Sequence, residues 1–235
     1  MVPIDRPGRP EAVRLPVMLQ KWCAISFLHW REEPAALQAR LPAGLEIGTF
    51  DGSAWVGLTP FHLRGLRLPF TPTVPWLSQF PEMNLRTYVL GPAGPGIWFF
   101  SLDAASLLAV FGARLTYGLP YHWASMQVQI AGARVDYRSV RRGSRASIAV
   151  QVGAPLPEPD ALTTFLTERY RLYSRPRRRL AFANVEHRPW PLCIAKLVHL
   201  EETVRRAAGL PGHGPPALVH YSPGVRVRVG RLQRA

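Results

Sequence analysis

The chain has 235 residues, of which 47% are hydrophobic, and its 24 prolines and 19 glycines are scattered between apolar runs. This composition supports a packed core with many turns and excludes a disordered or low-complexity chain. The formal net charge of +14 favours an anionic partner, which nucleic acid and small anionic molecules both satisfy.

The first residues carry four charges before any apolar run, so the sequence predicts no secretory signal and a cytoplasmic protein. Residues 87–113 are the longest weakly charged stretch, but Asp103 and several Gly and Pro residues make it a poor membrane span. Cys23 and Cys193 have no C-x-x-C partner, and their apolar surroundings predict buried thiols. We expect residues 1–19 and 230–235 to be loose.

The first half of the chain reads mainly as strands joined by turns. The Asp51-Gly52 pair between two apolar runs predicts a tight hairpin, and the proline-rich run 64–79 predicts a loop over a pocket mouth. The expected elements are a strand over 22–30, a helix over 34–40, strands over 45–50 and 53–63, and strands over 82–90 and 97–103.

The second half adds three helical windows. Residues 104–117 carry Leu107, Leu108, Phe111 and Leu115 at helical spacing, and residues 160–173 follow with a similar stripe. The other expected elements are strands over 121–130, 133–140, 145–152, 180–186, 192–198 and 225–229, and a helix over 201–208. This order predicts a mainly β, α+β fold: one domain over 1–235, built as an antiparallel barrel with a few outer helices.

A polar stripe on one expected strand is the strongest functional signal. Because side chains alternate along a strand, Glu82, Asn84, Arg86 and Tyr88 share one face, while Met83, Leu85 and Val89 take the other. The stripe either faces water or lines an internal pocket.

Several common chemistries lack their motifs. The histidines show no metal-ligand spacing, and the chain has no nucleophile elbow, dinucleotide fingerprint or phosphate-binding loop, so we predict no metal and no cofactor. Schiff-base chemistry needs a desolvated lysine, and only Lys21 and Lys196 exist. Lys196 alternates with apolar residues, but a lysine at a strand edge is the commoner outcome.

Seven separated motifs occur in an order that resembles the YqjF-like family, a bacterial group of unknown function within the acetoacetate-decarboxylase-like superfamily. The resemblance covers about residues 20 to 225. The motifs are WCAISFLHW, PAGLEIGTFDGSAWVGLTPF, FPEMNLRTYV, GIWFFSLDA, GARLTYGLPY, FLTERYRLY and VEHRPWPL.

The resemblance implies a cone-shaped β-barrel with a buried central pocket, and a homo-oligomer. In the decarboxylases a strand glutamate faces two adjacent lysines that follow a Gly-x-Pro break. Here Glu82 matches the glutamate and Gly118-Leu119-Pro120 matches the break, so Tyr121 and His122 occupy the lysine positions. Tyrosine cannot form an imine with a ketone, so the resemblance implies the fold without the decarboxylation mechanism.

The candidate site therefore contains Glu82, Tyr121 and His122 as acid–base groups, with ligand-binding residues Asn84, Arg86, Tyr88 and Arg114. An arginine could clamp a carboxylate or phosphate, which predicts a binder of organic acids or oxygenated metabolites, or a lysine-independent acid–base enzyme. A structural Glu82–Arg86 ion pair is the alternative interpretation.

A noncatalytic protein with an arginine-rich surface is the second hypothesis. It would bind an acidic partner or nucleic acid, but no cluster falls in a nucleic-acid-binding motif, so we regard nucleic acid as an unlikely partner. The clusters are Arg141-Arg142, Arg177-Arg178-Arg179, Arg205-Arg206, and Arg226 with Arg228.

Overall fold

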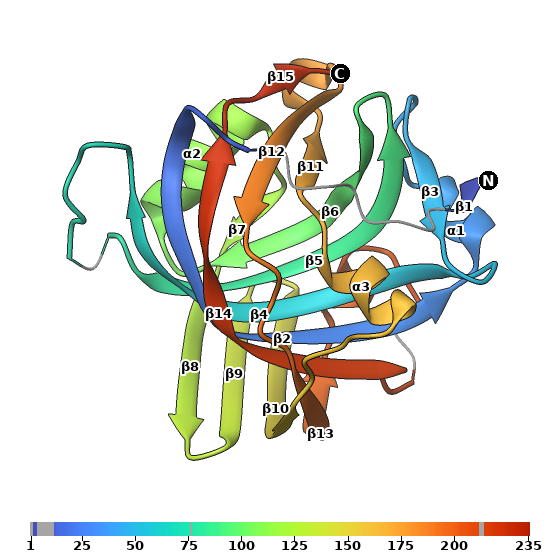
Figure 1. Ribbon diagram of the computed structural model, residues 1–235, viewed down its shortest axis with the longest axis vertical. Helices are drawn as coiled ribbons and strands as arrows, with labels where there is room; N and C mark the ends of the chain where they lie inside the picture. Colours follow the sequence, from blue (N-terminus) through green and yellow to red (C-terminus); the bar gives the residue numbers. More distant parts are fainter. Residues whose placement is uncertain (1, 4–11, 76, 212–213) are drawn as a thin grey trace.

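Seven strands of the computed structural model close into a barrel in the order β12-β11-β6-β5-β4-β2-β14, and the β12–β14 pairing completes the circle (Figure 1). The structure describes residues 2–3, 12–75, 77–211 and 214–235. The barrel strands are β2 (Pro16–Glu32), β4 (Ala54–Arg67), β5 (Phe80–Gly91), β6 (Gly94–Ala104), β11 (Arg171–Ser174), β12 (Ala181–His187) and β14 (Leu218–Gly230). The mainly β barrel is as predicted, although β11 pairs with β6 in parallel.

A second layer of strands covers part of the barrel's outer surface. The sheet continues from β14 through β13 (Cys193–Glu202), β10 (Ser144–Pro155), β9 (Arg134–Arg141) and β8 (Ser125–Ala131). Apolar residues of β9 and β10, including Tyr137 and Ile148, form one buried cluster with Met83 and Leu85 of β5. Both faces of β5 are therefore buried, and the face opposite Met83 and Leu85 points into the barrel.

Short elements complete the fold. They are β1 (Val2–Pro3), β3 (Glu46–Thr49), β7 (Tyr121–Trp123), β15 (Gln233–Arg234), α1 (Pro34–Gln38), α2 (Leu107–Tyr117), α3 (Ala161–Thr167), the 3-10 turn η1 (Pro176–Arg178) and α4 (Val204–Ala207). The termini are less loose than we expected, because β2 begins at Pro16 and β15 pairs with β12. The expected strand over 121–130 is two strands, since β7 pairs with β6 and β8 with β9.

Helix α2 begins at Leu107, where the Ser106 hydroxyl accepts the Ala109 amide hydrogen at 3.3 Å. Its predicted apolar stripe is outside the core, because Leu107, Leu108, Phe111 and Leu115 are all more than half exposed. Val110 and Tyr117 are the buried residues of this helix. The spacing thus predicted the helix correctly but not the face that it buries.

Helix α3 is much shorter than the predicted helix over 160–173. Asp160 caps it as expected, but the helix ends at Thr167 and Arg171 starts a strand that pairs with β12 and β6. Tertiary bonds explain the early end, since Glu168 accepts a hydrogen from the Tyr170 hydroxyl and, at 3.0 Å, from the Trp190 amide. Phe165 and Leu166 pack inside the barrel, so α3 closes one end of it.

Among the described residues, no helix is long and apolar enough to cross a lipid bilayer. Both cysteines are free: Cys23 is buried, as predicted, whereas Cys193 is only half-buried.

Candidate functional site

A cavity of about 560 Å³ lies inside the barrel and opens between α2 and the β4–β5 connection. Glu82, Asn84 and Arg86 all line it and are all buried, which places three of the four predicted stripe residues on an internal pocket rather than in water. In Figure 1 the β4–β5 connection extends from the left side of the barrel, and α2 lies on the same side.

Glu82 forms a hydrogen bond with Tyr121 on the cavity wall. The Tyr121 hydroxyl lies 3.0 Å from Glu82 Oε1, and burial raises the pKa of the Glu82 carboxyl to about 8. Burial, followed by the neighbouring Glu82, holds the pKa of Tyr121 well above its usual range. Glu82 is therefore protonated at neutral pH. Its carbonyl oxygen accepts the Tyr121 hydroxyl hydrogen, and its own hydroxyl hydrogen can be donated to a bound molecule.

The chain reaches Tyr121 through a sharp end to α2. Gly118 caps the helix in the left-handed conformation at φ 63°, and a β-carbon there would lie 2.6 Å from the Pro176 α-carbon. Strand β7 then pairs Tyr121 with Leu102 of β6. Arg114 Nε donates to the Tyr121 carbonyl oxygen at 2.6 Å. The predicted Gly-x-Pro break thus positions Tyr121 in the barrel.

Two predicted site residues lie away from the cavity lining. Arg114 is exposed and holds the backbone of Tyr121. His122 follows Tyr121 on the strand, so its ring points to the opposite face, where burial and the Arg141 charge lower its pKa. Neither side chain lines the cavity, so these placements do not fit the roles that the sequence suggested.

Arg86 is buried at the deep end of the cavity with few partners. Its Nη2 donates to the Leu166 carbonyl oxygen at 3.3 Å, and its Nε has no hydrogen-bond partner. Among the ion pairs of the described residues none joins Arg86 to Glu82, which overturns the alternative of a structural bridge. The guanidinium instead lies over the Phe27 ring, 5.7 Å from its centre.

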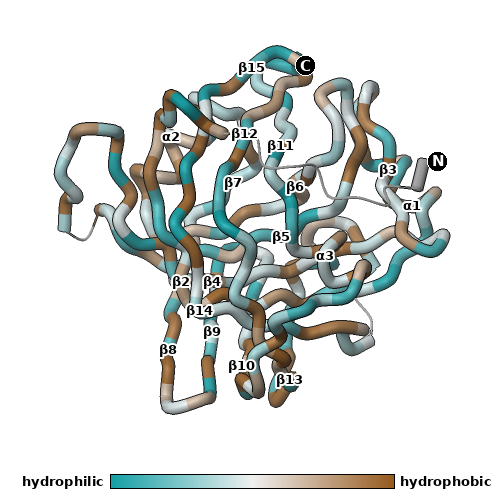
Figure 2. Tube along the Cα trace, in the orientation of Figure 1, coloured by the Kyte–Doolittle hydropathy of each residue, from teal (hydrophilic) through white to brown (hydrophobic). Residues whose placement is uncertain are grey.

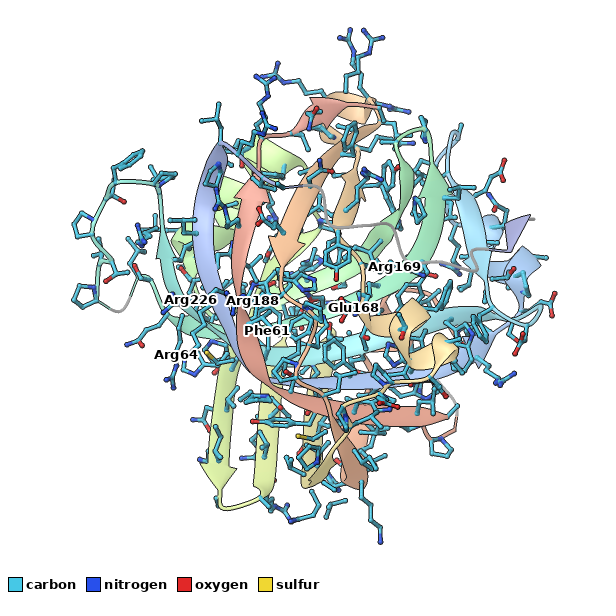
Figure 3. The ribbon with its side chains drawn as sticks, viewed as in Figure 1. Phe61, Arg64, Glu168, Arg169, Arg188 and Arg226 are labelled. Atoms are coloured by element: carbon cyan, nitrogen blue, oxygen red, sulfur yellow. The ribbon has the colours of Figure 1, made fainter. Side chains whose placement is uncertain are left out.

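Arg169 is a second buried cation on the cavity wall, and the sequence analysis missed it. Its Nη1 donates to the Glu168 carbonyl oxygen at 3.3 Å, while Nε and Nη2 are buried without partners. Burial, with a smaller contribution from Arg86, lowers the pKa of Arg169 to about 10. The only sequence signal is the Glu168-Arg169 pair, which helical spacing places inside the predicted helix over 160–173 rather than after its end at Thr167. Figure 3 shows both beside α3, within the outline of the barrel.

Aromatic rings line another side of the cavity. Trp22 and Trp190 stack with ring centres 6.0 Å apart and an interplanar angle of 15°, and the His187 ring lies 5.0 Å from Trp190. Burial lowers the pKa of His187, so the ring is neutral at physiological pH. These rings offer a flat apolar surface to a ligand.

Tyr88 lies behind the cavity wall and does not line the cavity. The predicted role of Tyr88 in direct ligand binding therefore does not fit its position. Its hydroxyl donates to the Leu166 carbonyl oxygen at 2.8 Å and accepts a hydrogen from His29 Nε2 at 2.7 Å. Both side chains are fully buried. This pair fixes Leu166, whose carbonyl oxygen also holds Arg86.

No lysine reaches the cavity, because Lys21 and Lys196 are both exposed and neither lines it. Within the described ranges, no group of three or more His, Cys, Asp or Glu side chains could hold a metal ion.

Two of the arginine clusters are partly committed to internal ion pairs. Arg141 Nε lies 2.7 Å from a carboxylate oxygen of buried Asp103, and the buried Arg205 lies 2.8 Å from Glu202. Arg142 and Arg206 are exposed. The positive surface is therefore smaller than the sequence suggested.

The closed barrel with an internal cavity is the fold of acetoacetate-decarboxylase-like proteins. The chain superposes on an acetoacetate decarboxylase-like enzyme from Sphingomonas wittichii RW1 with a TM-score of 0.69 and 16% identity, covering 97% of this chain and 96% of that one. It superposes on the enduracididine biosynthesis enzyme MppR complexed with pyruvate with a TM-score of 0.60 and 17% identity, covering 96% and 91%.

Within this fold, the chain belongs to the family described as "Uncharacterized conserved protein" (DUF2071), whose model matches residues 19–226. It is 39% identical over 211 residues to the uncharacterized protein YqjF of Bacillus subtilis (strain 168), which covers 88% of this chain and 87% of that protein. The resemblance to YqjF-like proteins is thereby confirmed.

Proposed function

We propose that the barrel binds an organic acid through its carboxylate, which lies between Arg86 and Arg169. The observation that carries the proposal is that both guanidiniums are buried on the cavity wall and keep N–H groups without partners. An isolated buried cation is costly, and an anion placed between two of them supplies the missing hydrogen bonds and opposite charge. MppR complexed with pyruvate supports the idea that a barrel of this kind accommodates a small acid.

Any chemistry at this site is of the acid–base type and does not use lysine. Protonated Glu82 can donate a proton to a ligand oxygen, and Tyr121 orients the carboxyl group. Both lysines are exposed outside the cavity, which supports chemistry without an imine intermediate. Sodium borohydride with a keto acid should therefore leave the mass of the protein unchanged, and an adduct on Lys196 would contradict this mechanism.

Thermal denaturation of the full chain against a panel of organic acids tests the binding proposal. A ligand at one hundred times its dissociation constant stabilises the folded state by about 2.7 kcal/mol, so binders should raise the melting temperature by several degrees. Arg86→Ala should lose this shift, and Arg64→Ala, which removes an exposed arginine outside the cavity, should keep it. A panel in which no acid shifts the melting temperature at millimolar concentration would refute the proposal.

A binder and an enzyme differ in the role of Glu82. If the protein catalyses a reaction, Glu82→Gln should abolish turnover while a ligand still binds. If the protein only binds, the same variant should change affinity alone.

A further inference from the structure

The two buried guanidiniums of the cavity, those of Arg86 and Arg169, lie on the wall beside α3, and the cavity continues well beyond them. Arg86 lies beside α3, and Asn84, Glu82 and Phe80 follow it along β5 toward the opening. Alternate residues of a strand are about 6.6 Å apart, so about 20 Å of strand separates Arg86 from Phe80. A small acid bound between the two guanidiniums would occupy only the first part of this length.

The part of the cavity between Glu82 and the opening is largely apolar. Phe80 of β5 and its partner Leu63 of β4 line it on one side, and Leu66, Leu77 and Ala109 line it near the opening. Water in such a channel finds few hydrogen-bond partners, and an apolar molecule would displace it favourably.

Exposed apolar side chains surround the opening. Leu68, Val74 and Leu108 line the cavity there, yet they are 59%, 44% and 65% exposed in the described structure. Figure 2 shows hydrophobic residues along both α2 and the β4–β5 connection. A ligand that extended to the opening would cover part of this surface, whereas a small acid would leave all of it in water.

We infer that the cavity takes an amphiphilic carboxylic acid, with its carboxylate between Arg86 and Arg169 and an extended apolar body that runs past Glu82 to the opening between α2 and the β4–β5 connection. The inference rests on the proposed function for the position of the carboxylate, and it adds the class of ligand. An uncharged apolar molecule would leave the unpaired N–H groups of both guanidiniums without partners, and a short acid would leave the channel filled with water.

Titration of the full chain with propanoate, hexanoate and decanoate, below the concentrations at which decanoate forms micelles, tests the class. Each methylene buried in the channel should raise the affinity about fourfold until the chain reaches the opening. Decanol has the same apolar body without the carboxylate and should bind at least about tenfold more weakly than decanoate. Equal affinities for propanoate and decanoate, or for decanol and decanoate, would overturn the inference.

Gly112 of α2 gives a matched pair of variants for the route of the apolar body. It lines the opening, and a β-carbon built on it meets nothing within 4 Å. Gly112→Trp should narrow the channel, weaken decanoate binding at least about tenfold and leave propanoate binding unchanged. Gly112→Ala should bind both acids as the wild type does, since a methyl group adds little bulk and favours the helix.

The two proposals fail in different ways. If no acid of any length binds, the proposed function is wrong. If propanoate binds with Arg86-dependent affinity but longer chains bind no better, only the ligand class is wrong. If Gly112→Trp folds, as circular dichroism can establish, and binds decanoate like the wild type, the apolar body does not leave the cavity beside α2.

Discussion

The guanidinium carbons of Arg86 and Arg169 lie 5.9 and 5.5 Å from the centre of the same Tyr88 ring. The ring face attracts both cations weakly, but within the described residues neither guanidinium forms an ion pair. Two buried like charges that both lie over one ring disfavour the ligand-free fold, and a bound anion would offset that cost. Under the proposed function, the two charges lower the stability of the ligand-free protein and are compensated when an acid binds.

Arg169→Met should make the ligand-free protein more stable. The replacement removes one of two neighbouring buried charges and keeps a long apolar side chain over Phe165, so we expect the free energy of unfolding to rise by about 1–3 kcal/mol. Urea denaturation measures this change, and Arg188→Met, at an exposed arginine, should shift it by less than about 0.5 kcal/mol. The variant should also lose the thermal shift with organic acids. If Arg169→Met were less stable than the wild type, the positive charge of Arg169 would already be compensated by neighbouring groups in the ligand-free protein.

Glu82 should make stability depend on pH. The folded state keeps the Glu82 proton up to about pH 8, whereas the unfolded chain releases it near pH 4.5. Between these values the folded state binds more protons, so the free energy of unfolding falls as pH rises, by roughly 5 kcal/mol in all. Urea denaturation at about pH 5 and about pH 9 should show this loss in the wild type and not in Glu82→Gln. Glu158→Gln changes an exposed carboxylate and should keep the wild-type profile.

The polar stripe was predictable because strand alternation is a local property. Glu82, Asn84 and Arg86 share a face whatever the rest of the fold does, and a half-buried strand leaves only water or a pocket for that face. The choice between water and a pocket depends on the second layer of strands, which buries Met83 and Leu85 on the other side of β5. The sequence alone does not reveal which strands form that outer layer.

Arg169 could not be predicted because its position depends on contacts distant in the sequence. A helical period continues to Tyr170, and only the bond from the Trp190 amide to Glu168 shows why the helix stops at Thr167. The exposed stripe of α2 is similar, since hydrophobic spacing indicates a helix but not which of its faces is buried. The homo-oligomer implied by the family resemblance stays a prediction.

Tyr88→Phe should test the support beneath Arg86. The variant leaves His29 Nε2 without its acceptor and removes one donor from the Leu166 carbonyl, so we expect a loss of about 1–3 kcal/mol in the free energy of unfolding. Tyr221→Phe is the control, because no side-chain hydrogen bond of Tyr221 occurs in the described part of the chain. Urea denaturation should separate the two variants by about 1 kcal/mol or more. Equal stabilities would mean that water replaces the lost partners.

Gly118→Ala should disturb the fold and the Glu82–Tyr121 pair together. Alanine at φ 63° costs about 1 kcal/mol, and its β-carbon would also lie 2.6 Å from Pro176. Gly132→Ala supplies the matched control, since Gly132 has φ 60° and a β-carbon there meets nothing within 4 Å. The difference between the two unfolding free energies isolates the contact with Pro176. We expect Gly118→Ala to lose about 1–3 kcal/mol more than the control, and to alter the pH dependence that Glu82 confers, because Tyr121 follows three residues later. Equal losses would mean that the contact with Pro176 adds nothing to the cost of a side chain at position 118.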